Sequence, residues 1–183
     1  MILRAPITEE EFRTYPVFQL PTDFSGDKYT RFMNQCWEWM EQICYQPLTA
    51  TTQTHTYPIS GRYANITPEG WLQIAPKHLP IVSVKTIRCR PAFQSDWQTL
   101  DRYEVLDDII VVHNAPAGRG AVVELVYTSG YDPVPEDLRL LLALFASQKA
   151  TAGTYDGTAG SSILPTWLPK EVVEGINRYK RVR

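Results

Sequence analysis

A strand-to-helix joint at residues 123–138 constrains the fold more than any other part of this 183-residue chain. Residues 123–128 form an apolar run rich in β-branched side chains, and Gly130 then interrupts the run, as at the end of a strand. Pro135 suits the first position of a helix, where its missing N–H is not needed. The two acidic residues that follow it lie where the helix dipole favours negative charge. The joint therefore predicts a strand followed closely by an apolar helix.

The residues between 49 and 130 read as predominantly β. Turn residues separate short candidate strands, which are Thr49–Tyr57, Gly70–Ala75, Ile81–Arg90, Tyr103–Leu106, Ile109–His113 and Ala121–Tyr127. The first of these is rich in threonine and is typical of an exposed or edge strand. Because no helical pattern lies between the strands, they favour an antiparallel sheet or a small barrel-like sandwich over βαβ units.

Helical patterns flank this β region. From Asp27 to Gln46 the apolar residues recur every three or four positions, and Pro47 ends the pattern. A second helix over Pro135–Thr151 is apolar nearly all round, so it must be buried on more than one side. We expect a neighbouring subunit to supply part of that cover. The candidate subunit contacts are Trp39, Leu140 and Leu144.

These elements predict an α+β fold with four segments. Residues 1–26 form an N-terminal arm, in which a capping-box pattern at Thr8–Glu11 could start a short helix through Tyr15. The α+β core spans residues 27–151, and a Gly/Ser/Thr-rich linker follows over 152–165. The last segment, 166–183, contains an amphipathic helix with a basic end, and its charge is either ordinary helix-end charge or a contact with DNA phosphates or an acidic protein.

Composition excludes several classes of protein. The 18 basic and 20 acidic residues nearly balance, so the overall charge gives no case for nucleic-acid binding. No run approaches the roughly 18 apolar residues of a membrane span, and the first residues lack the apolar stretch of a signal peptide. The three cysteines Cys36, Cys44 and Cys89 have no paired spacing, and we expect them to be small buried hydrophobic side chains.

No catalytic constellation is evident in the sequence. The three histidines have no metal-ligand spacing, and the glycine-rich stretch at 153–162 lacks the ending of a phosphate loop. Asp107 and Asp108 are adjacent carboxylates, which on a strand would point to opposite faces, so a turn explains them better. Ser129 lacks the flanking glycines of a nucleophile elbow. We therefore expect no enzyme activity, no cofactor and no metal.

Several phrases in order along the chain resemble the head–tail connector family, the head-completion adaptors of tailed phages. The phrases are Gln46-Pro47-Leu48, Leu79–Ile87, Tyr103-Glu104-Val105, the strand Val122–Tyr127, the joint Ser129–Leu138 and the terminal Tyr179-Lys180-Arg181. Together they cover roughly residues 27–183. The N-terminal arm and the long threonine-rich strand depart from the family pattern.

The resemblance implies a structural role in the virion of a tailed phage, with synthesis in the host cytoplasm. Family members form a ring of about twelve copies beneath the portal protein. That ring extends the channel for genomic DNA, which passes without sequence-specific binding, and it joins the head to a stopper or tail protein. The candidate portal contacts are Trp167, Val172, Val173, Ile176, Arg178, Tyr179, Lys180, Arg181 and Arg183.

Two alternatives stay open at the level of sequence. A tail terminator or another ring-forming tail component is also a structural protein, although such proteins usually lack two long helices flanking a sheet. A small-molecule-binding β domain or enzyme would need convergent polar groups in a pocket, and the sequence offers no convincing set.

Overall fold

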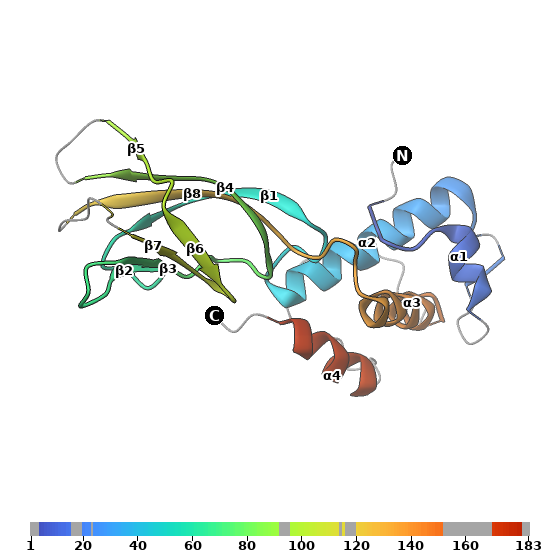
Figure 1. Ribbon diagram of the computed structural model, residues 1–183. Coiled ribbons are helices and arrows are strands. Elements are labelled where there is room, and N and C mark those ends of the chain that lie inside the picture. The colour runs from blue at the N-terminus through green and yellow to red at the C-terminus, as the bar shows by residue number, and fades with distance from the viewer. Residues whose placement is uncertain are drawn as a thin grey trace. The chain divides into compact units, whose positions relative to one another are not determined.

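The computed structural model describes residues 4–15, 20–22, 24–91, 96–113, 115, 120–151 and 170–180. The chain divides into two compact units (Figure 1). Residues 1–48 and 133–183 belong to a helical unit, and residues 49–132 form a β unit that is inserted between them in the sequence. The segment 27–151, predicted to be one core, therefore crosses both units, and the predicted linker at 152–165 lies outside the described residues.

The described residues of the helical unit form four helices: α1 (Glu9–Thr14), α2 (Gly26–Cys44), α3 (Glu136–Thr151) and α4 (Lys170–Tyr179). The Thr8 side chain caps α1 as predicted, because its hydroxyl oxygen accepts a hydrogen bond of 3.2 Å from the backbone N–H of Glu11. At the end of α2, Tyr45 adopts the left-handed conformation, with φ of 56°, and its N–H bonds back to the last turn.

The apolar stripe predicted on the long helix is confirmed as a core. Trp37 and Met33 of α2 are buried, and the thiols of Cys36 and Cys44 are buried on the same side. Helices α3 and α4 both contact α2, and they contact each other. Burial raises the pKa of the Cys36 and Cys44 thiols to about 12, so both remain protonated, unreactive packing groups at neutral pH.

The strands described in the β unit form two antiparallel sheets, which confirms the predicted α+β fold class. One sheet has the order β1-β8-β4-β5, and its strands are β1 (Thr51–Pro58), β4 (Ile81–Arg90), β5 (Gln98–Thr99) and β8 (Val122–Ser129). The other has the order β2-β3-β7-β6, and its strands are β2 (Ala64–Ile66), β3 (Leu72–Ile74), β6 (Tyr103–Leu106) and β7 (Ile109–Val112). The threonine-rich strand β1 is an edge strand, as its composition predicts.

Side chains from both sheets meet in a single hydrophobic core. Tyr127, Leu125 and Ile87 come from the first sheet, and Ile74 and Ile110 come from the second. Since successive residues of a strand point to opposite faces, this core leaves one outward face on each sheet. The β unit is therefore a two-layer sandwich (Figure 1).

The joint at the end of β8 needs a glycine. Gly130 has φ of +111°, and an added Cβ would overlap the carbonyl oxygen of Thr49 and lie 2.9 Å from the nitrogen of Ala50. The sequence predicts Pro135 at the first position of the helix, but it is the N-cap residue, one position before the helix begins. Its carbonyl accepts the first helical hydrogen bond, of 3.1 Å, from the N–H of Arg139. The turn predicted at Asp107-Asp108 is confirmed, with Asp107 in the left-handed conformation at φ of 51°.

Candidate interaction surfaces

The C-terminal helix contributes to the core of its own unit, which changes the meaning of its predicted contacts. Val172 and Ile176 are fully buried, and an added Cβ at Gly175 would overlap the side chain of Leu141 on α3. The side-chain amide of Gln46 donates a hydrogen bond of 2.7 Å to the carbonyl of Tyr179. Two of the candidate portal contacts therefore face inward in this structure.

The remaining candidates on this helix differ in exposure. Arg178 is exposed, and Val173, Tyr179 and Lys180 are half-buried. The Lys180 ammonium lies 5.4 Å from the ring centre of Tyr45. The candidates Trp167, Arg181 and Arg183 lie outside the described residues. An outward contact through this helix would therefore use its basic end rather than its apolar stripe.

Two other helices of the same chain pack against the apolar helix α3. Leu138 and Leu142 of α3 are fully buried, and α3 contacts both α2 and α4. The amphipathic α4 therefore covers a second side of this helix, and the expected contact of its exposed part with a neighbouring subunit stays a prediction. Of the candidate subunit contacts, Leu140 is 38% exposed, Leu144 is half-buried, and Trp39 is half-buried with its ring stacked on Phe145 at 4.4 Å.

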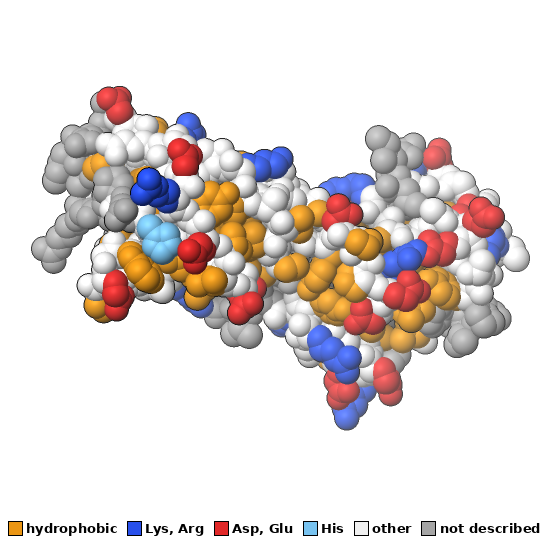
Figure 2. Space-filling model, in the orientation of Figure 1, with side chains coloured by type: hydrophobic (Ala, Val, Ile, Leu, Met, Phe, Trp, Pro, Cys, Tyr) orange, Lys and Arg blue, Asp and Glu red, His pale blue; other side chains and the backbone are white. Residues whose placement is uncertain are grey.

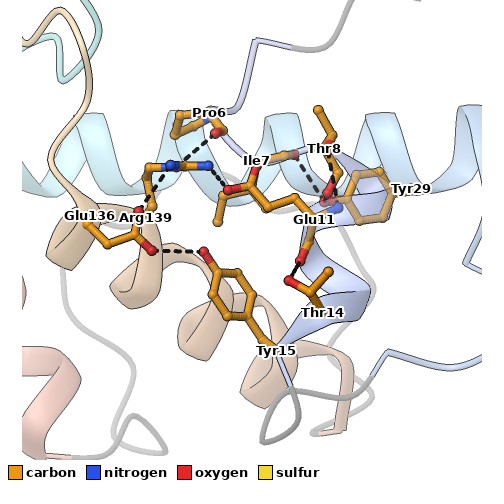
Figure 3. A network of polar contacts seen from close by, with 9 residues as sticks. All are labelled: Pro6, Ile7, Thr8, Glu11, Thr14, Tyr15, Tyr29, Glu136 and Arg139. Carbon is orange, nitrogen blue, oxygen red and sulfur yellow. Dashed lines mark hydrogen bonds and ion pairs between the residues drawn. The ribbon is translucent and has the colours of Figure 1, made fainter.

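A polar network fastens the N-terminal segment to α3 (Figure 3). The guanidinium of Arg139 donates a hydrogen bond of 3.2 Å to the carbonyl of Pro6 and forms ion pairs with Glu11 and Glu136. The hydroxyl of Tyr15 donates to Glu136 over 3.2 Å. These contacts make residues 4–15 a fixed part of the helical unit, although the sequence suggested an arm.

Tyr29 holds the same segment from α2. Its hydroxyl lies 3.1 Å from the carbonyl oxygen of Ile7 and 3.0 Å from that of Thr8, so one O–H donates to two acceptors (Figure 3). Burial raises the pKa of this phenol, which keeps the proton that both contacts need.

Replacing Arg139 with methionine should loosen the attachment of this segment. The substitution leaves the Pro6 carbonyl and the Glu11 carboxylate without their donor, and we expect the free energy of unfolding to fall by about 1–2 kcal/mol. Limited proteolysis should then cut within residues 4–15. The matched control is Arg4→Met, which removes an exposed ion pair with Glu38 and should cost less than about 1 kcal/mol. Equal proteolytic resistance of the two variants would contradict the role of Arg139.

The fold brings two histidines together that the sequence keeps 23 positions apart. The rings of His55 and His78 lie with their centres 5.2 Å apart, and the ring of Tyr127 lies 5.9 Å from that of His55. Burial lowers the pKa of His55, so it is neutral at pH 7. Sheet pairing created this proximity, and no spacing in the sequence indicated it. Among the described residues, no group of three or more potential metal ligands occurs.

Exposed large hydrophobic side chains are concentrated on the sheet β2-β3-β7-β6. The side chains on or beside this sheet that are between 39% and 55% exposed are Ile66, Trp71, Val105, Leu106 and Ile109. Figure 2 shows hydrophobic side chains of the β unit beside a histidine, with acidic and basic side chains next to them. Such a concentration is typical of an interaction surface.

No helix in the described ranges has the length and apolarity needed to span a membrane. Neither a protein-family model nor a curated protein matches the sequence. Several solved structures are similar to the chain, including two from gene transfer agent particles. One is from the neck of an empty gene transfer agent (GTA) particle, computed with C6 symmetry, with a TM-score of 0.62. The other is from the virion of a native GTA particle, with a TM-score of 0.60.

Both similarities extend over the whole chain. Each covers 100% of this chain and 94% of the other chain, at 17% sequence identity. The similarity therefore covers both the helical unit and the sandwich of this chain. At this identity, the similarity shows a common fold.

Proposed function

We propose that this chain is a structural protein of the neck of a phage-like particle, where it joins the head to the tail. The observation that carries the proposal is the fold similarity over 100% of the chain to a protein from the neck of a gene transfer agent particle. The connector-like phrases of the sequence point to the same place independently. A role in the particle, rather than in catalysis, is part of the proposal.

The finer assignment is a head–tail adaptor that forms a ring beneath the portal protein and extends the DNA channel. The neck of the similar particle was computed with C6 symmetry. A ring of about twelve copies is compatible with that symmetry, since twelve is a multiple of six. Its partners would be the portal protein on one side and a stopper or tail protein on the other.

Within this proposal, the basic end of α4 contacts the portal. Deleting residues 166–183 is a poor test because it also removes the buried Val172 and Ile176 from the helical core. Reversing charge with Arg178→Glu, Arg181→Glu and Arg183→Glu keeps those residues in place. The matched control is Arg31→Glu, at an exposed position of α2.

The decisive experiment combines the purified chain with the portal protein of the same genome and images the mixture by electron microscopy. We expect a ring coaxial with the portal, and we expect the triple variant to lose at least ten-fold in portal affinity while Arg31→Glu does not. Normal attachment of the triple variant would move the contact elsewhere on the chain. Binding to the end of the tail tube instead of the portal would make the chain a tail terminator.

A further inference from the structure

The two outward faces of the β-sandwich differ in chemistry. We call the outward face of β2-β3-β7-β6 the apolar face, and it is defined by Trp71, Leu106 and Ile109. These side chains are 43%, 55% and 39% exposed. Register supports the assignment, because inward-facing and outward-facing pairs alternate along β6 and β7. The pair of Leu106 and Ile109 lies three rows beyond the inward-facing pair of Tyr103 and Val112, so it faces outward.

Acidic groups border the apolar face. Asp107 and Asp108 form the turn between Leu106 and Ile109, and both are exposed. The carboxylate of Glu104 is 63% exposed and lies 3.4 Å from the imidazole of His113, against which the Trp71 ring packs edge-on. A basic residue beside this face is Arg102, just before β6. The three carboxylates of Glu104, Asp107 and Asp108 outnumber it.

The opposite surface of the sandwich is basic. We call the outward face of β1-β8-β4-β5 the basic face, and it is defined by Lys85, Arg88 and Arg90 of β4. The Lys85 ammonium reaches across β8 and donates to the hydroxyl of Thr52 on β1 over 2.9 Å. Both arginines lie over the ring of Trp97, at 5.7 and 5.2 Å from its centre.

Among the described residues, Glu124 and the exposed Asp96, which precedes Trp97, partly balance the charge of this face. Glu124 of β8 pairs with Arg88, whereas Lys85 and Arg90 are exposed. The remainder of the face presents threonine hydroxyls from β1 and the side chains of Val122 and Val126 from β8. The two faces of the same sandwich are therefore electrostatically complementary to each other.

We propose that the apolar face of one copy docks on the basic face of the next copy. The acidic rim around Leu106 and Ile109 would meet Lys85 and Arg90, and the aliphatic parts of these basic side chains would cover the apolar residues. Because the two faces lie on opposite sides of one sandwich, the contact is head-to-tail and repeats from copy to copy. A repeated head-to-tail contact generates a ring or a filament rather than a closed dimer. The inference deepens the proposed function, on which it rests, by assigning the contact between ring subunits.

Charge reversal tests this contact directly. One variant, Glu104→Lys with Asp108→Lys, makes both faces basic, and the other, Lys85→Glu with Arg90→Glu, makes both faces acidic. Each variant alone should lose at least ten-fold in self-association, as measured by sedimentation velocity at low salt. An equimolar mixture should regain assembly, since copies of opposite charge can alternate, and the regained assembly should weaken at high salt.

A second pair of variants tests the apolar part. Leu106→Ser with Ile109→Ser should weaken self-association. Leu140→Ser changes a comparably exposed leucine of the helical unit, which the sequence offered as a candidate subunit contact, so it tests the competing location, and we expect it to leave self-association unchanged. Thermal unfolding of each variant checks that the fold is retained. A loss of assembly with Leu140→Ser alone would place the contact on the helical unit and overturn the inference.

Three further results would also overturn it. The first is normal assembly of either charge-reversed variant, and the second is no recovery of assembly in their mixture. The third is a wild-type chain that is monomeric in solution and present as separate single copies on particle necks. Incorporation into particle necks is scored separately. Normal incorporation of both reversed variants would sink the inference and leave the proposed neck function intact. Self-assembly through these faces without incorporation into necks would support the inference and contradict the proposed neck function.

Discussion

Replacing Gly130 with alanine is expected to lower the free energy of unfolding of the β unit by more than about 3 kcal/mol. Two physical effects combine at this position. The φ of +111° is strained for any residue with a Cβ, and that Cβ would overlap the backbone of Thr49, which cannot move without disturbing the start of β1.

Gly70→Ala is the matched control for this prediction. Gly70 has φ of +84°, but an added Cβ there has no neighbour within 4 Å, so only the conformational strain of about 1–2 kcal/mol remains. Urea denaturation followed by tryptophan fluorescence compares the two. Equal losses would show that the close approach to Thr49 contributes nothing.

Leu142→Ala should destabilise the helical unit by about 2–5 kcal/mol, because the side chain is fully buried on α3 and its removal leaves a cavity. Leu140→Ala, two positions away on the same helix, removes a side chain that is 38% exposed and should cost less than about 1 kcal/mol in the free chain. Chemical denaturation at low protein concentration measures both. A large loss with Leu140→Ala under those conditions would mean that residues of this chain cover it in solution.

The long elements were predictable because each carries its own periodic pattern. The apolar stripe of α2, the β-branched run of β8 and the Asp107 turn all follow from local chemistry, and the structure has them where the sequence predicts them. The threonine content of β1 also indicated an edge position correctly. Strands β2 and β5 were missed, since three and two residues are too short to show alternation.

What the sequence could not supply was the identity of packing partners. The apolar character of α3 correctly required two covers, but the second cover is α4, which lies beyond residues 152–169 in the sequence. The proximity of His55 and His78 and the polar contacts of Arg139 likewise depend on tertiary pairing. The two chemically different faces of the sandwich became visible only when the strand register separated inward from outward side chains.

The chain enters and leaves the β unit at neighbouring positions, which are hydrogen-bonded to each other. The N–H of Ala50 donates to the carbonyl of Tyr131 over 3.1 Å, and Thr49 forms a parallel bridge with Tyr131, so the first and last residues of the β unit lie side by side. Residues 49–132 are thus an inserted segment, a cassette, whose first and last residues contact each other. Recombination at these two boundaries would exchange both outward faces together and keep them matched to each other. In evolutionary terms, such a cassette allows the subunit contact to diverge between related particles while the helical unit keeps its sequence.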